Sequence, residues 1–348
     1  MRTTATGWIS VGRTITIRRT GTSTVSSSRS SRDIFRGVSR VTERLLITGA
    51  TGFVGRCAAA HWRERRPDVE VWGTSDRPRT DDYAPERYRQ LDLRDGDAMK
   101  ALVKACRPTR VLHLASLIAG HDLEALLSVN VLGTDRLYEA LASAELPNLR
   151  IVQVASAAMY GRIGVDELPI TEKQPFRPVT AYAVSKVAQE YLAIAAGYAK
   201  GLSIVRARAF NMLGPGQPEH LVPMTFVRQV KSVADGDTDR IRVGLTSARR
   251  DFVDVRDAVA AFDLMLEKGT AGTAYNVASG TDVSVDEIIR EVLDVAGVEA
   301  RIEVDESRLR PVDVPVVRAD ITEARRELGW QPKVPLRRSL EDMWREVS

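Results

Sequence analysis

The sequence predicts an α/β protein: a doubly wound parallel sheet with a smaller C-terminal α/β lobe. Three observations lead to this prediction. Short apolar runs alternate with segments of helical periodicity, a glycine-rich turn follows the first apolar run, and polar residues follow several later runs. Such alternation is typical of parallel sheets covered by helices on both faces, and ligands bind these sheets at the carboxyl ends of the strands.

The first strongly patterned unit occupies residues 44–62. An apolar strand over 45–48 leads into Gly49, Gly52 and Gly55, and an alanine-rich helix follows. This G-x-x-G-x-x-G spacing provides a tight turn, close approach of the backbone to a pyrophosphate, and close packing of the helix on the strand. Free N–H groups at the helix N-terminus favour the phosphates. The unit therefore predicts a dinucleotide-binding domain of the Rossmann type.

Four more apolar runs are the next expected strands, and helical stretches separate them: residues 69–73, 88–93, 110–116 and 149–156. Polar residues at their carboxyl ends include Asp92, His113, Ser116 and Ser156. Asp92 could contact the adenine of a cofactor, or it could cap the helix that follows it.

The loop after the second strand bears on the choice of cofactor. An acidic residue at the strand tip would hold the ribose 2′-hydroxyl of NAD, whereas an arginine would accommodate the 2′-phosphate of NADP. Gly73 occupies the predicted tip, with Asp76, Arg77 and Arg79 just beyond it. The pattern leaves both cofactors open and favours NADP(H) over NAD(H).

Tyr182 and Lys186 form a candidate acid–base pair in the segment 180–190. They lie four residues apart, so a helix places them on one face. An ammonium held there would lower the tyrosine pKa from its usual value of about 10, as a general acid or base requires. Taken alone, the pair is equally compatible with an ordinary amphipathic helix.

Charge and composition exclude several classes of protein. The chain has 348 residues and a formal net charge of +4, but residues 1–40 hold eight arginines and one acidic residue. Because the basic character belongs to this segment, we expect no nucleic-acid partner. No apolar run approaches the roughly 18 residues of a membrane helix. The two cysteines have no metal-type spacing and suggest no disulfide framework, which indicates a cytoplasmic protein without a metal.

Residues 1–40 are rich in Ser, Thr, Gly and Arg and show no sustained helical or strand period. We expect a disordered leader, or a start assigned upstream of the true protein. An organelle-targeting peptide and a functional arm are the alternatives.

Motifs spread over residues 44–344 resemble the extended short-chain dehydrogenases/reductases that act on nucleotide sugars. They occur in the order typical of that family: "GATGFVG", "LHLAS", "NVLGT", "ASAAMYG", "YAVSK", "FNMLGPGQ" and "RRDFVDVRD". The resemblance implies that Ser156, Tyr182 and Lys186 are catalytic. Ser156 would hydrogen-bond the reacting oxygen, Tyr182 would exchange a proton with it, and Lys186 would tune Tyr182 and hold the nicotinamide ribose.

The resemblance and the strand ends together imply an extended cofactor site. The residues expected to contact the cofactor are Gly49, Thr51, Gly52, Phe53, Val54, Gly55, Asp76, Arg77, Asp92, Leu93, Leu114, Ala115, Ser116, Asn130, Tyr182, Lys186 and Ala209.

The reaction class follows from the segment after Ser156. Dehydratases resembling this chain carry a glutamate there, and related epimerase/reductases carry a cysteine, whereas this chain has Ala157, Ala158 and Met159. The resemblance therefore implies reduction of the C4 keto group of a GDP-4-keto-6-deoxyhexose. A nucleotide-sugar 4-epimerase with tightly bound NAD is the alternative, and a 4,6-dehydratase or a non-catalytic protein on the same fold is less favoured.

The C-terminal part resembles the branch that handles GDP-mannose derivatives, above all in "RLRPVDVP" at 308–315. The substrate contacts that this implies are Ser156, Ala157, Asn211, Arg228, Arg250, Arg310 and Asp313. Arg250 could instead be a surface charge before a strand, and Arg228 and Asp313 have similar alternatives.

We expect a dinucleotide-binding domain over 41–208 plus about 250–268, and a nucleotide-sugar-binding lobe over 209–249 and 269–335. The resemblance also implies a homodimer, in which helices at 122–144 and 181–199 form a four-helix bundle. Packing on the sheet explains the small side chains of these helices equally well.

Overall fold

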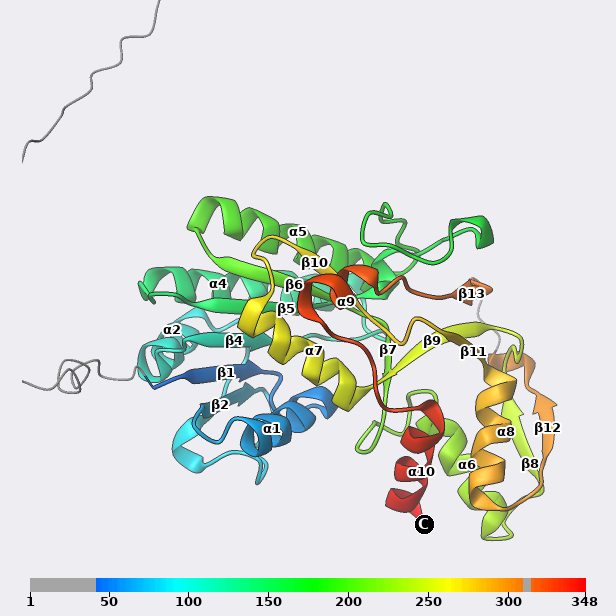
Figure 1. Cartoon of the computed structure of the whole chain (residues 1–348). Coiled ribbons are helices and arrows are strands. Elements are labelled where there is room, and N and C mark those ends of the chain that lie inside the picture. Colours follow the sequence, from blue (N-terminus) through cyan, green and yellow to red (C-terminus); the bar gives the residue numbers. More distant parts are fainter. Residues whose placement is uncertain (1–41, 309–313) are drawn as a thin grey trace, which may run out of the picture. The chain divides into compact units, whose positions relative to one another are not determined.

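The computed structural model describes residues 42–308 and 314–348. Within them, a seven-stranded sheet has the order β10-β6-β5-β4-β1-β2-β3 (Figure 1). All neighbouring strands of this sheet are parallel. Its strands are β1 Arg44–Thr48, β2 Glu70–Ser75, β3 Tyr88–Gln90, β4 Arg110–His113, β5 Arg150–Ser156, β6 Ser203–Ala209 and β10 Ala274–Val277. The predicted α/β fold with a Rossmann-type parallel sheet is confirmed.

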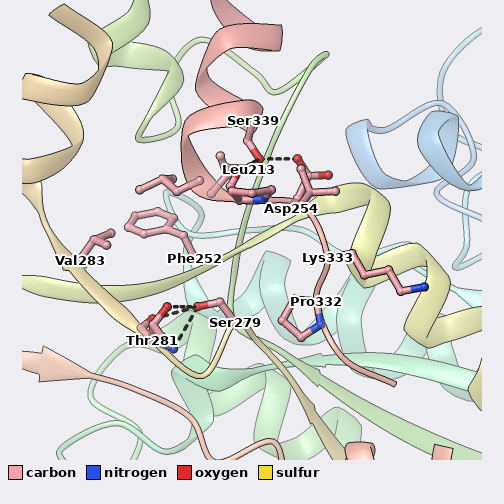
Figure 2. A pocket seen from close by; sticks show the side chains of 12 residues that line it. Leu213, Phe252, Asp254, Ser279, Thr281, Val283, Pro332, Lys333 and Ser339 are labelled. Atoms are coloured by element: carbon pink, nitrogen blue, oxygen red, sulfur yellow. Dashed lines mark hydrogen bonds between the residues drawn. The ribbon is translucent and has the colours of Figure 1, made fainter. Parts of the chain in front are cut away.

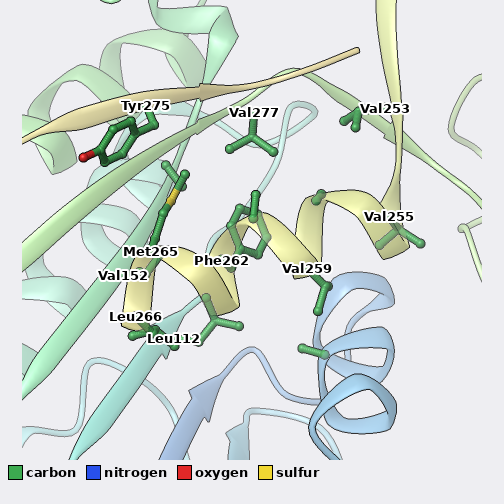
Figure 3. Close-up of a cluster of buried hydrophobic side chains, with 14 of the residues drawn as sticks. Leu112, Val152, Val253, Val255, Val259, Phe262, Met265, Leu266, Tyr275 and Val277 are labelled. Carbon is green, nitrogen blue, oxygen red and sulfur yellow. The ribbon is translucent and has the colours of Figure 1, made fainter. Parts of the chain in front are cut away.

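Helices cover both faces of this sheet. The helices of one face are α1 Phe53–Arg65, α7 Val255–Lys268 and α9 Thr322–Leu328, and those of the other are α2 Gly96–Cys106, α4 Thr134–Ser143 and α5 Ala181–Lys200. Successive side chains of a strand point to opposite faces, so Leu45 and Ile47 join the first core and Leu46 joins the second. In Figure 3, side chains of α7, including Phe262 and Met265, point toward the strands.

A third core lies in the C-terminal part of the chain, where buried residues of three helices pack together. These helices are α6 Met224–Ala234, α8 Val285–Ala296 and α10 Leu336–Val347. A two-stranded sheet joins them, formed by β8 Arg240–Val243 and β12 Arg301–Val304. A four-stranded sheet consists of β7 Asn211–Leu213, β9 Arg249–Asp254, β11 Asp282–Ser284 and β13 Val316–Val317.

The segment 250–268, expected to belong to the dinucleotide-binding domain, includes most of a strand, β9, that does not join the main sheet. β9 pairs with β7, β11 and β13 in the smaller sheet, and only α7, which follows it, packs on the main sheet. The returning strand is β10, which lies within the segment assigned to the substrate lobe and pairs with β6. The other proposed domain limits stay predictions.

The helix expected over 122–144 is a continuous helical run with an irregular middle. It consists of α3 Leu123–Leu127, a π-helical turn η2 Ser128–Gly133, and α4. The remaining short turns are η1 Pro85–Arg87, η3 Ala157–Met159, η4 Val165–Glu167 and η5 Glu306–Arg308. No helix in the described part of the chain combines the length and apolar character needed to cross a membrane.

Candidate active site

The glycine turn between β1 and α1 is too crowded for larger residues. Gly49 has a φ of +68°, and a Cβ there would lie 2.9 Å from the backbone nitrogen of Ala115. A Cβ on Gly55 would lie 2.4 Å from the carbonyl oxygen of Gly49. Gly52 is the N-cap of α1, and no side chain in the described residues caps this end. The N–H groups of the first turn therefore have no side-chain cap in the described residues, and their binding of the cofactor phosphates stays a prediction.

The predicted contacts after β4 lie beside this turn. The backbone nitrogen of Leu114 donates to the carbonyl oxygen of Thr48 at 3.2 Å, and that of Ala115 donates to the Thr48 hydroxyl at 3.2 Å. The Ser116 hydroxyl donates to Oδ1 of Asn130, 3.1 Å away. Asn130 is buried in the π-helical turn, a kind of irregularity that often marks functional sites.

Two details of the second and third strand ends differ from expectation. β2 continues to Ser75, so Gly73 lies inside the strand and Asp76 is the first residue beyond it. The Ser75 hydroxyl accepts a hydrogen bond from Thr51, which ties the glycine turn to this strand end. The helix cap assigned to Asp92 as an alternative is wrong, because Asp95 caps α2 by accepting from two backbone N–H groups. Asp92 is exposed, and its hydrogen bond with Arg94 lowers its pKa.

Ser156 and Tyr182 meet where β5 ends and α5 begins. Ser156 is the last residue of β5 and lies beside Ala209 at the end of β6. α5 begins at Ala181, with Thr180 capping it, so Tyr182 lies in its first turn. Burial raises the pKa of Tyr182, and a hydrogen bond with Ser156 lowers it by less. The expected lowering by Lys186 is therefore not found, because desolvation of the phenol dominates.

Lys186 lies one turn further along α5 and is only 2% exposed. Its Nζ donates to the carbonyl oxygen of Val154 at 2.9 Å and to Oε1 of Gln189 at 2.5 Å. Burial lowers the pKa of Lys186 to about 7, and the nearby carboxylate of Glu190 opposes this shift. Gln189 is not among the site residues predicted from the sequence, although its position three residues after Lys186 puts both on one helix face.

A cavity of about 600 Å³ is lined by two of the predicted substrate residues, Asn211 and Arg250. Its walls also include Phe226 and Phe252. Arg228 is not among the residues that line it; this side chain is exposed and pairs at 2.6 Å with Glu219, which does line the cavity. The predicted contacts Arg310 and Asp313 lie outside the described residues.

A second cavity, of about 280 Å³, lies at the start of α10 (Figure 2). Ser339 donates a hydrogen bond to Asp254 there, while Ser279 and Thr281 contact each other. Among the described residues, neither cavity is lined by Ser156, Tyr182 or Lys186. The described residues include no group of three His, Cys, Asp or Glu side chains that could hold a metal ion.

A glycine turn between β1 and an uncapped helix, with Ser156 and Tyr182 at the carboxyl end of β5 in the same parallel sheet, defines the class of dinucleotide-dependent dehydrogenases and reductases. Comparison with known proteins gives the family. The model of the GDP-mannose 4,6 dehydratase family matches residues 46–343, and the chain belongs to this family.

Individual relatives support this assignment. The chain is 33% identical to GDP-6-deoxy-D-mannose reductase of Pseudomonas aeruginosa over 310 residues, which cover 86% of this chain and 95% of the relative. It is 29% identical to UDP-glucose 4-epimerase of Corynebacterium glutamicum, over 86% of this chain and 94% of the relative. A solved structure of RMD from Pseudomonas aeruginosa, complexed with NADPH, has a TM-score of 0.79 and 31% identity, and the match covers 88% and 98% of the two chains. The expected relation to the extended short-chain dehydrogenases/reductases is confirmed.

Proposed function

We propose that this chain reduces the C4 keto group of a GDP-4-keto-6-deoxyhexose with NAD(P)H, forming a GDP-6-deoxyhexose such as GDP-rhamnose. The observation that carries the proposal is the turn directly after Ser156, where Ala157, Ala158 and Met159 form η3. These side chains offer no carboxylate to remove a C5 proton. This part of the site is therefore suited to a simple reduction, in which C4 receives a hydride and its oxygen receives a proton. The similarity to GDP-6-deoxy-D-mannose reductase supports the same reaction.

Proton transfer in this reaction is assigned to Tyr182. Because burial raises its pKa, the hydroxyl stays protonated at neutral pH and can donate to the C4 oxygen as the alcohol forms. The Ser156 hydroxyl would donate a hydrogen bond to the same oxygen, and the Lys186 ammonium would stabilise the tyrosinate that remains. A bound dihydronicotinamide supplies the hydride.

The residues of the glycine turn fit a dinucleotide. The space that side chains at positions 49 and 55 would need is filled by the protein's own backbone, so the tight turn and the close packing of α1 on β1 both require glycine. Asp76 and Arg77 are both exposed directly after β2. We favour NADP(H), because Arg77 can pair with a 2′-phosphate and a relative of known structure was solved with NADPH.

The larger cavity is proposed as the site of the nucleotide diphosphate. The Arg250 guanidinium donates to the carbonyl oxygen of Arg249 at 2.8 Å and lines the cavity together with Asn211. A planar guanidinium can bond two phosphate oxygens at once. Phe226 and Phe252 provide apolar wall for a base or ribose.

This assignment predicts that GDP binds at least about tenfold more tightly than UDP or dTDP in calorimetry, a difference of about 1.4 kcal/mol. Replacement of Arg250 by methionine should weaken GDP binding by about tenfold or more, through the loss of a charge-assisted hydrogen bond. Arg290→Met is the matched control, because Arg290 is an exposed residue of α8 that pairs with Asp286. Turnover of the GDP-4-keto sugar with NADPH and with NADH then measures the reaction and the cofactor preference.

The same measurements test the alternative. A preference for UDP or dTDP, together with copurifying NAD and turnover without net cofactor consumption, would identify a nucleotide-sugar 4-epimerase. The similarity to UDP-glucose 4-epimerase is the reason for testing this alternative to the reductase reaction.

We also propose a homodimer formed through the helical run of α3, η2 and α4 together with α5. Apolar side chains of this region are exposed: Leu132 by 57%, Val184 by 41% and Tyr191 by 59%. Val184 and Tyr191 are seven residues apart, so they lie on one side of α5. A second copy would remove this stripe from water.

The dimer proposal predicts that wild type sediments as a dimer at micromolar concentration and that Tyr191→Glu sediments as a monomer. A charge buried in the interface is costly, which gives the physical reason for this change. Glu299→Gln, a change at an exposed site remote from α5 in sequence, should leave sedimentation unchanged. A monomeric wild type would contradict the proposal.

A further inference from the structure

We infer that Gln189 is a positioning residue for Lys186: its side-chain amide links the ammonium to a buried chain of hydrogen bonds that begins beside the glycine turn. This inference deepens the proposed function, since it rests on Lys186 acting on Tyr182 and on the cofactor. Gln189 is 1% exposed, so its amide has only protein partners in this site.

The Lys186 end of the chain is held by two neutral acceptors. Of the three N–H donors of an ammonium, one bonds the Val154 carbonyl oxygen and one bonds Oε1 of Gln189. In the proposed function, the third serves Tyr182 and the cofactor. Gln189 therefore fixes the direction of the ammonium without adding a charge of its own.

The orientation of the Gln189 amide follows from its other end. Nε2 of Gln189 lies 2.8 Å from Oγ1 of Thr134. The Thr134 hydroxyl donates its single hydrogen to the carbonyl oxygen of Asn130 at 2.7 Å, so its oxygen must accept from Gln189. A flipped amide would place its NH₂ group against the Lys186 ammonium, two donors facing each other. Oε1 must therefore point to Lys186.

The same logic assigns the tautomer of His113. Nε2 of His113 lies 2.8 Å from the Thr134 oxygen, whose hydrogen is already used, so Nε2 carries the proton and donates it. Nδ1 then accepts from the Thr48 hydroxyl at 2.7 Å, and the Thr48 oxygen accepts from the Ala115 N–H. Burial, together with the charge of Lys186, lowers the pKa of His113 to about 3. The ring stays neutral at working pH and serves as a fixed link.

The charged and titratable groups around Lys186 show why a neutral amide matters. Tyr182 and Glu190 belong to the same helix, and His113 approaches from β4. The Glu190 carboxylate is fully buried and is occupied by the guanidinium groups of Arg206 and Arg208 on β6. The direct partners of the ammonium that the structure shows are thus the uncharged Val154 carbonyl and Gln189 amide. Position 189 is consequently a place where one substitution can change the charge balance of Lys186.

Two variants separate positioning from simple packing. Gln189→Glu keeps an oxygen acceptor for Lys186, lets Thr134 turn its hydroxyl to donate, and adds a negative charge. Gln189→Leu has a similar volume and removes the acceptor. The readout is the pKa of Lys186, measured by NMR on protein containing ¹³C,¹⁵N-lysine; the chain has only eight lysines, and Lys186→Arg identifies the signal.

The expected result is a Lys186 pKa raised by about one unit or more in Gln189→Glu and lowered in Gln189→Leu. The upper limb of the pH dependence of NADPH affinity should move with it. Gln217→Leu removes another buried amide, one that bonds the Met212 carbonyl, and should leave the Lys186 pKa unchanged.

A Lys186 pKa that stays the same in both Gln189 variants would overturn the inference. Because neither measurement needs the sugar substrate, the outcome is separate from that of the proposed function. Shifted pKa values in a protein that does not turn over any GDP-4-keto sugar would support the role of Gln189 and reject the proposed reaction.

Discussion

Tyr182→Phe should lower the turnover number for the GDP-4-keto sugar by roughly 10²–10⁴-fold, the usual contribution of a positioned general acid. In the proposed reaction the phenol donates a proton to the C4 oxygen, and this variant removes the phenol hydroxyl. The rest of the first turn of α5 keeps its cap at Thr180. NADPH affinity should therefore change by less than about tenfold, or about 1.4 kcal/mol.

Stopped-flow measurement of NADPH oxidation separates hydride transfer from product release in this variant. Tyr198→Phe is the matched control: it lies on the same helix, is 90% exposed, and should be fully active. A Tyr182→Phe enzyme with wild-type turnover would remove the tyrosine from the mechanism and, with it, the main argument for acid catalysis at this strand end.

Glu190→Gln should destabilise the fold by about 3 kcal/mol or more, the cost of breaking a buried ion pair from one side. Glu190 is fully buried, and Arg206 and Arg208 both donate to it, at 2.9 Å and 2.5 Å. Arg208 is fixed further because its guanidinium lies over the ring of Phe176, 4.7 Å from the centroid. With an amide at position 190, two guanidinium groups would remain buried without their counter-charge.

Urea unfolding measures this loss. Glu139→Gln provides the comparison, since Glu139 pairs with Lys200 of α5 at the surface, at 2.5 Å, and exposed ion pairs contribute little to stability. If both variants lowered the free energy of unfolding by the same small amount, the buried ion pairs of Glu190 with Arg206 and Arg208 would not be what holds α5 on β6. The pKa of Lys186 should also fall in Glu190→Gln, because the Glu190 carboxylate raises it in the wild type.

The features that the sequence predicted well are those encoded over short distances. The glycine turn, the strands β1 to β5 and the placement of Tyr182 and Lys186 on one helix each depend on spacing within one strand, turn or helix. The need for glycine at position 55, or the four-residue spacing that puts Tyr182 and Lys186 on one face of α5, can be predicted without the rest of the chain. The limits of single elements were less certain: the segment after β3 offers two aspartates as helix caps, and only the structure shows that Asp95 is used.

Features that depend on distant segments could not be predicted in this way. The four residues of β10, Ala274–Val277, form a short run with one polar residue that would suit either sheet, and pairing with β6 decides its place. The raised pKa of Tyr182 and the link from Thr48 through His113, Thr134 and Gln189 to Lys186 depend on burial by several elements. The spacing from Lys186 places Gln189 on the same face of α5, but the local sequence does not show that its amide is buried among hydrogen-bond partners.

The order of strands also limits how the chain can be dissected. The main sheet takes its outer strand, β10, from residues that come after β7, β8 and β9, which belong to the smaller sheets. A truncation after Ala209 would leave β6 as an edge strand with its backbone N–H and C=O groups unpaired, and it would remove α7 and α9 from one face of the sheet. No single cut in the sequence therefore releases a complete dinucleotide-binding half. Shortening the protein from its C-terminus cannot separate cofactor binding from sugar recognition.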